Sequence, residues 1–501
     1  MFKKVLIANR GEIAVRIIRT CKEMGIKTVA IYSEVDRCAL HVLKADEAYF
    51  VGPSVSKESY LNVKSILKII KKCKADAVHP GYGFLSENSD FANIIINNNI
   101  GWIGPSPESI SMMGDKIAAR KLANKIGVPI IPGTIEPIKN NRSAIKIAKK
   151  IGYPIIIKAC AGGGGKGMRV VYSDLEMKEL LILAQSESKK AFSDDRIFLE
   201  KYLEEPHHIE IQVLSDNKGS IISFGERECS IQRRYQKIIE EAPSPFIDTE
   251  LKKKLSTDAI KITSFCNYEG LGTIEFLVDK YKNYYFLEMN TRIQVEHPIT
   301  EMTTNIDLVN EQIKIAYGKK IKYKNKDILF QGHAIECRIY AEDGFNDFMP
   351  STGIIEEIRF PQGPGVRIDE GIQRGQEVSS YYDPLLAKLI TWGIDRKQAL
   401  NRMIRALEEF YIYGIKTNIQ FCNLICRQKS FFNGKYSTKT LELLLKNLID
   451  KNNILNHKEV VAASISAINL ELDSDSKLDE NNFKIEPINN WSKIGRLKNL
   501  K

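Results

Sequence analysis

The chain has 501 residues, of which 43% are hydrophobic and 27% are charged. Its length exceeds one ordinary hydrophobic core and suggests about three domains, and its composition is that of a globular protein. The net charge of +11 comes from basic residues spread along the sequence. No helix-turn-helix, zinc finger or aromatic-basic platform accompanies them, so we expect no binding to nucleic acid.

No apolar run approaches the roughly 18 residues of a membrane span. The sequence leads directly into an apolar strand-like run, without a leader peptide, so we expect a cytoplasmic protein that does not bind membranes. The nine cysteines are scattered, and the closest two, Cys422 and Cys426, have helical spacing with no histidine or further cysteine nearby. Reduced core thiols are therefore expected rather than disulfides or a zinc site.

Residues 1–114 alternate between strand-like and helix-like segments. An apolar run at 4–8 is typical of a buried strand, and residues 28–32 are typical of the next one. Between them lies a helical pattern that ends at Gly25, with an apolar stripe formed by Ile13, Ala14, Ile17, Ile18 and Cys21. This alternation predicts a doubly wound parallel sheet. No glycine fingerprint follows the first strand, so a dinucleotide site is not indicated.

A glycine-rich loop at 162–167 lies in the central part of the chain, between strand-like runs at 153–159 and 168–173. No helix opens behind the loop, and no serine or threonine follows a Gly-Lys pair, so neither a Rossmann fingerprint nor a P-loop fits. Four consecutive glycines are costly for a purely structural turn. A mobile flap whose backbone amides close over phosphates fits this composition better.

An acidic hairpin is predicted further along the central part. Residues 273–278 and 284–287 are strand-like, and a polar turn at 279–283 separates them. A hairpin centred on this turn would place Glu275 directly opposite Glu288. Two facing carboxylates are destabilising unless a cation lies between them.

Asn290 would point to the same side as Glu288, because alternate residues of a strand share a face. Two carboxylates and an amide suit Mg²⁺ or Mn²⁺ better than zinc. An isolated pair of glutamates would more often be a solvated surface. Arg292, Gln294 and Glu296 follow at alternate positions, however, and they favour a functional site.

The last third of the chain combines strand-like runs at 334–339 and 386–391 with a helical pattern at 396–409. Beyond residue 450 an apolar helix-like piece at 459–472, an acidic linker and a basic end follow. We expect this tail either to dock a partner or to pack on the preceding domain. The expected parts of the chain are 1–114, 115–330 with a lid at about 131–203, 331–446, and the tail 447–501.

Four segments, in the same order, resemble biotin carboxylases of the ATP-grasp superfamily: 79–88 (HPGYGFLSEN), 161–168 (AGGGGKGM), 232–237 (QRRYQK) and 289–298 (MNTRIQVEHP). The similarity runs from about residue 1 to about residue 443. It implies an α/β and α+β fold with an N-terminal Rossmann-like domain, a central ATP-grasp domain with a mobile lid, and a C-terminal mixed α/β domain.

The resemblance also implies a reaction in two steps. ATP, with two Mg²⁺ or Mn²⁺ ions, phosphorylates bicarbonate to carboxyphosphate, and biotin is then carboxylated on N1′. No Ala-Met-Lys-Met biotinylation motif occurs in the chain. We therefore expect biotin on a separate carrier protein, a separate carboxyltransferase subunit, and a homodimer of this chain. The final acceptor, which is acetyl-CoA, propionyl-CoA or pyruvate, stays open.

The family motifs assign individual roles to residues of this chain. ATP contacts are implied for Lys116, Lys158, Gly163, Gly164, Gly165, Glu200, Lys201, Leu203, His208, Gln232, Glu275, Leu277 and Glu288. Metal ligands are implied at Glu275, Glu288 and Asn290. Bicarbonate contacts are implied for Lys237, Arg292, Gln294 and the Val295 backbone. Biotin contacts are implied for Tyr82 and Arg338. The implied catalytic set is Glu296 as general base, Arg338 at the biotin enolate, Arg292 and Lys237.

Ordinary explanations compete with several of these roles. A lone lysine is usually a solvated surface residue, Arg338 alone would be an ion pair at a strand end, and Tyr82 could be structural. A planar oxyanion, however, needs a fork donor, a point charge and a neutral amide, and Arg292, Lys237 and Gln294 offer them. Tyr235 departs from the family, which commonly has histidine there, so its contact with nucleotide is in doubt.

Three other functions compete with this one. Another ATP-grasp ligase, of the carbamoyl-phosphate or purine-pathway type, would share the acidic hairpin but should lack the Arg-Ile-Gln-Val-Glu segment. An inactive assembly subunit should have lost Glu288 or Glu296, and both are present. A nucleic-acid-binding protein has only the net charge in its favour.

Overall fold

A computed structural model describes residues 1–138, 140–160 and 168–446. Residues 1–441 form one compact unit and residues 442–501 a second one. The expected helix-like piece of the tail and the glycine loop therefore lie outside the described residues. Among the residues that the structure describes, no helix is long and apolar enough to cross a membrane.

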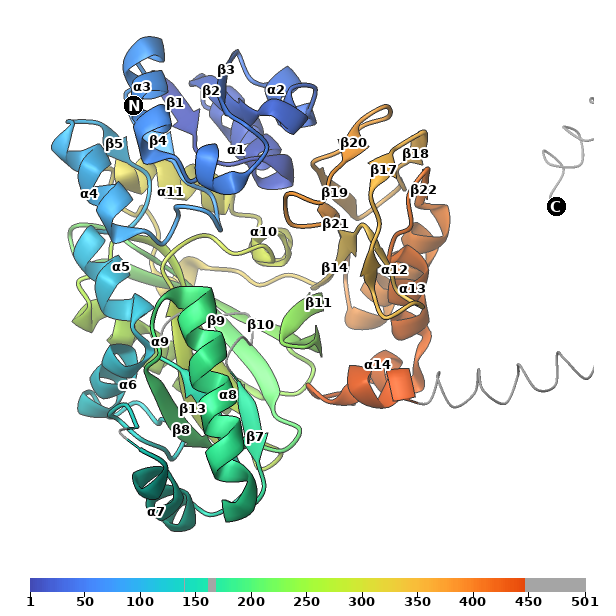
Figure 1. Cartoon of the computed structure of the whole chain (residues 1–501). Helices are drawn as coiled ribbons and strands as arrows, with labels where there is room; N and C mark the ends of the chain where they lie inside the picture. The colour runs from blue at the N-terminus through green and yellow to red at the C-terminus, as the bar shows by residue number, and fades with distance from the viewer. Residues whose placement is uncertain (139, 161–167, 447–501) are drawn as a thin grey trace, which may run out of the picture. The chain divides into compact units, whose positions relative to one another are not determined.

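The N-terminal part is a five-stranded parallel sheet with the order β3-β2-β1-β4-β5, as predicted (Figure 1). Its strands are β1 (Lys4–Ile7), β2 (Lys27–Ser33), β3 (Glu47–Gly52), β4 (Ala77–His79) and β5 (Gly101–Trp102). Its helices are α1 (Gly11–Glu23), α2 (Leu40–Lys44), α3 (Val63–Cys73), α4 (Ser89–Asn97) and α5 (Pro107–Gly114). The predicted apolar stripe of α1 is buried. The helix ends where Gly25 adopts a φ of 72°.

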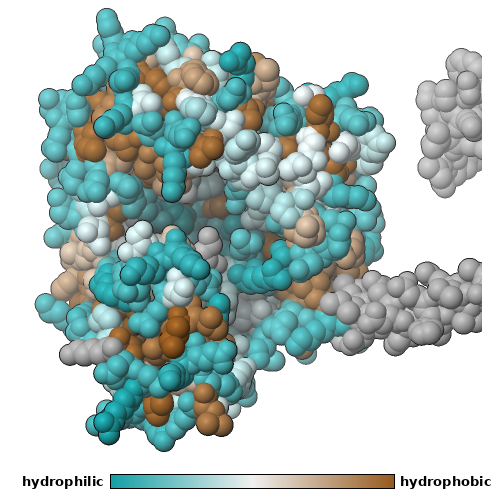
Figure 2. Space-filling model, in the orientation of Figure 1, coloured by the Kyte–Doolittle hydropathy of each residue, from teal (hydrophilic) through white to brown (hydrophobic). Residues whose placement is uncertain are grey.

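The lid is a small domain with its own hydrophobic core. Its sheet has the order β7-β6-β8, formed by β6 (Ile155–Ala159), β7 (Arg169–Val171) and β8 (Ile197–Lys201). Helices α7 (Asn141–Ile151) and α8 (Asp174–Phe192) pack on this sheet (Figure 1). Helix α6 (Lys116–Lys125) precedes the lid. The surface is hollowed beside the lid, and the visible walls of the hollow are mostly hydrophilic (Figure 2).

An eight-stranded antiparallel sheet runs from the central part into the C-terminal part, with the order β13-β12-β9-β10-β11-β14-β21-β19. Its strands are β9 (His207–Ser215), β10 (Ile221–Arg233), β11 (Gln236–Ala242), β12 (Gly270–Val278), β13 (Tyr284–Asn290), β14 (His333–Tyr340), β19 (Val366–Glu370) and β21 (Leu385–Gly393). Because β11 pairs with β14, the two parts share backbone hydrogen bonds. One sheet therefore carries the acidic hairpin and the strand of Arg338.

Helices cover this sheet at several places. They are α9 (Thr249–Phe265), α10 (His297–Thr304), α11 (Leu308–Ala316), α12 (Arg396–Glu409), α13 (Ile419–Arg427) and α14 (Lys429–Phe432). Helix α12 coincides with the predicted helix at 396–409 and packs on β14 and β21. Short two-stranded pairs join β15 (Glu342–Asp343) to β16 (Met349–Pro350), β17 (Gly353–Ile354) to β20 (Glu377–Val378), and β18 (Glu357–Arg359) to β22 (Tyr411–Tyr413).

All nine cysteines are free, and eight of them are buried. This confirms the expectation of reduced core thiols. Cys337 on β14 nevertheless lies beside Cys422 and Cys426, and burial together with its hydrogen bonds to these two sulfur atoms raises the pKa of Cys337 well above its usual value. Cys422 and Cys426 thus have Cys337 as a third cysteine neighbour. The sequence around the pair did not show this, because β14 is distant in the chain.

Candidate active site

The hairpin of β12 and β13 has the predicted register at its functional end. Glu275 lies opposite Glu288, and Thr273 lies opposite Asn290. A bulge follows, because Phe276 pairs with Phe286 and leaves one residue of β13 unpaired. The predicted register is therefore correct at Glu275 and Glu288. Between the bulge and the turn it is wrong by one residue.

Protein cations neutralise the two facing carboxylates. Glu275 is buried, and its Oε2 lies 2.9 Å from Nε2 of His208. Its Oε1 lies 3.1 Å from Nζ of Lys237 and accepts hydrogen bonds of 2.8 and 2.7 Å from the amides of Asn290 and Gln294. Although burial opposes ionisation, Lys237 and His208 hold the pKa of Glu275 well below its ordinary value. Glu288 is more exposed and pairs with Lys116 at 3.1 Å.

Lys237 is the centre of the charge network. Its Nζ lies 2.6 Å from Glu210, 3.1 Å from Glu275 and 2.6 Å from Glu296. Burial alone would lower the pKa of Lys237, but these three carboxylates raise it well above its usual value. The ammonium group is therefore charged, and it offsets part of the negative charge of the three carboxylates.

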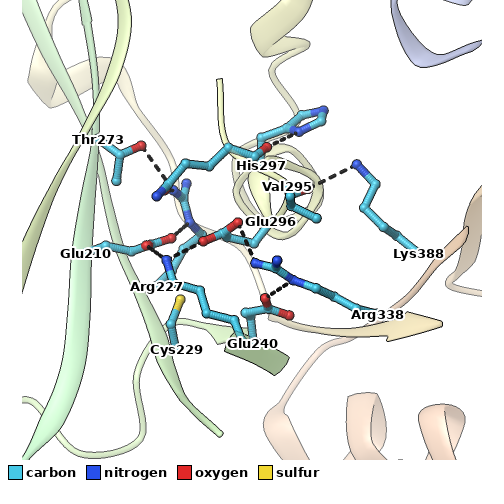
Figure 3. A network of polar contacts seen from close by, with 12 residues as sticks. Glu210, Arg227, Cys229, Glu240, Thr273, Val295, Glu296, His297, Arg338 and Lys388 are labelled. Atoms are coloured by element: carbon cyan, nitrogen blue, oxygen red, sulfur yellow. Dashed lines mark hydrogen bonds and ion pairs between the residues drawn. The ribbon is translucent and has the colours of Figure 1, made fainter. Parts of the chain in front are cut away.

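Glu296 is held between two cations at the start of α10 (Figure 3). Its Oε1 accepts from Lys237 at 2.6 Å, and its Oε2 accepts from Nη2 of Arg338 at 3.0 Å. Nε of Arg338 donates to Glu240 at 2.5 Å. Burial opposes ionisation of Glu296, but Lys237, Arg338 and Arg227 hold its pKa well below the usual value. The side chain is thus an anion, as a general base must be before it accepts a proton.

The residues of the implied bicarbonate pocket are joined through this network. Arg292 donates to Glu87 at 2.9 Å and to Oδ1 of Asn290 at 2.9 Å. Gln294 donates to Glu275 and accepts from Arg227 at 2.7 Å. The Val295 carbonyl accepts from the buried Lys388 at 3.0 Å (Figure 3). The guanidinium group of Arg292, the ammonium group of Lys237 and the amide of Gln294 therefore all belong to the network around Glu275 and Glu296.

The implied nucleotide contacts lie along the lid and the neighbouring strands. Glu200 lies in the lid strand β8, is buried, and pairs with Lys158 at 2.5 Å and with Arg120. Gln232 lies 2.7 Å from Nδ1 of His208. Nζ of Lys201 is instead directed to the carbonyl oxygens of the lid residues 152 and 153.

Other implied contacts have less defined surroundings. Leu277 lies opposite His208 across the β12–β9 pair, and Leu203 is half-buried. Gly163, Gly164 and Gly165 lie outside the described residues. Tyr82, after β4, packs against the N-terminal core, and its hydroxyl has no hydrogen-bond partner in the described part of the chain.

Tyr235 lies in the two-residue loop that joins β10 to β11. The φ angles of Arg234 and Tyr235 are 48° and 67°, which is the pattern of the tight hairpin turns that match strand twist. The loop keeps Lys237 opposite Gln232. Half of the Tyr235 surface, 51%, is exposed.

Several residues that build this site were not singled out by the sequence patterns. Arg227 is fully buried and binds Glu210, Gln212 and Gln294. Its charged neighbours in the sequence give no sign of burial. Glu87 is different, because it belongs to the segment 79–88 that resembles the family. Its pairing with Arg292 is a contact that this motif could have indicated.

The donor set of the hairpin fits a hard divalent cation. Glu275, Glu288 and Asn290 offer carboxylate and amide oxygens at adjacent register positions. Two buried clusters of the described residues also have the spacing of metal ligands, namely His208 with Glu210 and Glu275, and Glu210 with Cys229 and Glu296. Lys237 contacts Glu210, Glu275 and Glu296. An ammonium group therefore already neutralises these clusters. Glu275 shares this ammonium group, so the hairpin differs from the clusters in Glu288, which is more exposed and pairs with Lys116 instead.

Three sequence families match successive parts of the chain. They are the biotin carboxylase N-terminal domain over residues 1–110, the ATP-binding domain of the carbamoyl-phosphate synthase L chain over 115–324, and the biotin carboxylase C-terminal domain over 336–443. The ATP-binding domain alone would suit several ligases. The two flanking domains distinguish biotin carboxylases from them.

Named relatives are similar over most of their length. "Biotin carboxylase" of Nostoc sp. is 50% identical, with 89% of this chain and 100% of the relative covered. "Biotin carboxylase 1" of Bacillus subtilis is 51% identical, with 88% and 98% covered. One subunit of the pyruvate carboxylase of Methanothermobacter thermautotrophicus is 50% identical, with 87% and 89% covered. Relatives of this chain thus serve as subunits of multi-component carboxylases.

Solved structures agree with this. The biotin carboxylase domain dimer of Hydrogenobacter thermophilus 2-oxoglutarate carboxylase, in complex with MgADP, ADP and bicarbonate, matches with a TM-score of 0.86 and 47% identity, covering 88% of this chain and 97% of that one. A biotin carboxylase nucleotide complex from Campylobacter jejuni matches with a TM-score of 0.86 and 45% identity, covering 88% and 99%. Fold, site and sequence agree, and the chain belongs to the biotin carboxylase family.

Proposed function

We propose that this chain carboxylates biotin with bicarbonate at the expense of ATP, through carboxyphosphate. The observation that carries this proposal is the position of Glu296, a buried anion held by Lys237 and Arg338 beside the acidic hairpin. This arrangement supports a base and an anion pocket next to each other. The fit to MgADP and bicarbonate complexes of the family supports the same substrates.

The lid and the hairpin hold the nucleotide in this proposal. Lys158, Lys116 and His208 supply charge and hydrogen bonds for the phosphates and the ribose, and Glu200 keeps Lys158 in place. Glu275, Glu288 and Asn290 would hold Mg²⁺ or Mn²⁺, which neutralises charge on the phosphate oxygens. Lys116 then loses its present partner Glu288 and can turn to the phosphates.

Bicarbonate binds to Arg292, Lys237, Gln294 and the Val295 backbone. Glu296 accepts the bicarbonate proton while the bicarbonate oxygen forms a bond to the γ-phosphorus, and ADP leaves. Carboxyphosphate then breaks down to CO₂ and phosphate, the released phosphate takes the N1′ proton of biotin, and N1′ forms the bond to CO₂. Arg338 donates to the enolate oxygen of biotin at this stage, which is an oxyanion-type stabilisation. Closure of the lid excludes water from the labile intermediate.

The partners follow from the same assignment. Biotin would reach the site on a separate carrier protein, and a carboxyltransferase subunit would take the carboxyl group to acetyl-CoA, propionyl-CoA or pyruvate. The names of relatives include pyruvate and propionyl-CoA carboxylase chains. A homodimer is expected, since the related Hydrogenobacter domain is a dimer.

Omission of single substrates tests the proposal. ADP release by the full chain is measured with ATP and Mg²⁺, with bicarbonate or free biotin left out in turn. The proposal expects release that depends on bicarbonate and that free biotin accelerates. A rate indifferent to both compounds would exclude the assignment. Arg338→Met serves as an internal comparison, because it should lose the acceleration by biotin.

A further inference from the structure

Two glutamates, Glu240 and Glu336, face each other inside the eight-stranded sheet. They are direct register partners on β11 and β14, and both are fully buried. Opposite side chains in an antiparallel pair stand about 5 Å apart at their Cβ atoms. Arg338, two residues after Glu336, shares their face of the sheet. Any interaction between these carboxyl groups therefore acts directly beside the Arg338 guanidinium.

Of the two carboxyl groups, only one has a cationic partner among the described residues. Oε1 of Glu240 accepts from Nε of Arg338 at 2.5 Å, whereas its Oε2 accepts no hydrogen bond. Among the described residues, no hydrogen bond or ion pair reaches either oxygen of Glu336. Two bare carboxylates at this separation, without water access, would repel each other strongly.

The nearby cations are already engaged. Arg338 is shared between Glu240 and Glu296. Lys388, opposite Arg338 on β21, donates to the Val295 carbonyl at 3.0 Å and lies 3.1 Å from Glu12 and 3.8 Å from Asp369. Neither cation is available to compensate a charge on Glu336. A proton is the remaining way to neutralise it.

We propose that Glu240 and Glu336 share one proton as a buried carboxyl–carboxylate pair, in which Glu336 is the acid and a positioning residue for Arg338. The Glu336 hydroxyl donates to the free oxygen of Glu240, and Glu240 keeps its negative charge for Nε of Arg338. The guanidinium is then fixed with its Nη2 towards Glu296, where the reaction needs it. This inference rests on the proposed function only for the role of Arg338.

The groups that face the pair agree with this distribution. They are Arg338 and Tyr340 on β14, Lys388 on β21, Lys237 on β11, Glu296 at α10, and Glu12 of α1, which reaches the pair only through Lys388. Burial, followed by the nearby carboxylates, raises the pKa of Glu336 well above its ordinary value, and Lys388 and Arg338 only partly oppose this. Burial also raises the pKa of Glu240, to about 7, although Arg338 opposes this shift.

Infrared spectroscopy of the full chain tests the proton directly. The measurement is made at about pH 8.5, where carboxyl groups with ordinary pKa values are ionised. Glu12, whose pKa is raised to about 7, is mostly ionised there as well. The wild type should still show a protonated carboxyl band at this pH, and Glu336→Gln should lack it. Glu336→Met, of similar volume, replaces Glu336→Gln if the amide prevents folding. A wild-type spectrum without the band would overturn the proposal.

The pH dependence of activity distinguishes a positioning role of Glu336 from a purely structural role. Once the pair loses its proton, repulsion should move Glu240 away from Arg338, so biotin-dependent turnover of the wild type should decline at alkaline pH. Glu336→Gln should shift this decline to higher pH, whereas Glu240→Gln should raise the KM for biotin and lower kcat at every pH. An unchanged profile in Glu336→Gln contradicts the proposal. ATP cleavage that ignores biotin in the wild type would instead contradict the proposed function, and the infrared result would still stand.

Discussion

At the scale of single residues, the site depends on a few carboxylates whose charge is fixed by named cations. Glu296 is the clearest of them, with Lys237 and Arg338 on its two oxygens. Glu296→Gln keeps the shape but cannot accept a proton. We expect kcat to fall by about 10²–10⁴-fold, the usual range for a general base. ATP binding, measured by calorimetry, should change little, and a loss of nucleotide affinity would contradict the assignment.

Glu288 is predicted to act on the metal rather than on the fold. Its only described ion pair is with Lys116, and 27% of its side chain is exposed. Glu288→Gln should raise the Mg²⁺ concentration needed for half-maximal ADP release and reduce turnover, because a neutral amide is a weaker ligand. Glu250→Gln, on the exposed face of α9, is the matched control. Equal Mg²⁺ requirements in both variants would exclude the metal role.

The sequence revealed the site residues that belong to recognisable motifs. It did not reveal the buried residues that bind them and hold them in place. Glu275 and Glu288 could be placed opposite each other because strand alternation and a short turn fix a register. Arg227 and Lys388 could not be found in this way, since arginine and lysine are usually exposed and only the fold shows that both are buried. Their partners Gln294 and Val295 lie about 67 and 93 residues away.

At the scale of elements, the strand β11 carries charges on both faces. Glu240 faces the site, whereas its neighbour Glu241 faces the C-terminal helices and binds His333, Arg396 and Tyr436. Burial opposes ionisation, but His333 and Arg396 lower the pKa of Glu241 to about 2. The position of α12 was predictable from its apolar pattern. Its attachment to β11 was not, because the contact joins residues 155 positions apart.

Glu241→Gln should loosen this attachment. A folded-state pKa of about 2 against the ordinary 4.5 means that the ionised side chain stabilises the folded state above about pH 4.5 and that this stability is lost as the pH falls towards 2. The shift corresponds to roughly 3 kcal/mol. Urea unfolding should therefore show a deficit of about this size at pH 7 that shrinks below pH 4.5. A deficit independent of pH would indicate a packing effect instead.

At the scale of the whole molecule, the C-terminal part packs against one edge of the N-terminal sheet. Ligands of doubly wound sheets usually bind at the carboxyl ends of the strands. Here Tyr382, from the C-terminal part, occupies this place. Its hydroxyl donates to the Ser54 carbonyl at 2.5 Å and accepts from the hydroxyl of Ser33, at the end of β2, at 2.6 Å. Its ring lies under Arg10, 4.3 Å away. Tyr382 thereby joins the C-terminal part to this edge of the N-terminal sheet.

The contact of Tyr382 is predicted to stabilise the fold and to hold the N-terminal and C-terminal parts in position for the reaction of biotin. Tyr382→Ala removes the ring that lies between Arg10 and Tyr60, so unfolding free energy should fall by about 1–3 kcal/mol. Tyr382→Phe keeps the ring and loses only the hydroxyl, which accounts for about 1 kcal/mol. Biotin-dependent turnover should fall more than bicarbonate-dependent ATP cleavage in the alanine variant, because Tyr82 lies on the N-terminal part and Arg338 on the C-terminal sheet. Equal losses of both activities would show that the contact supports folding alone.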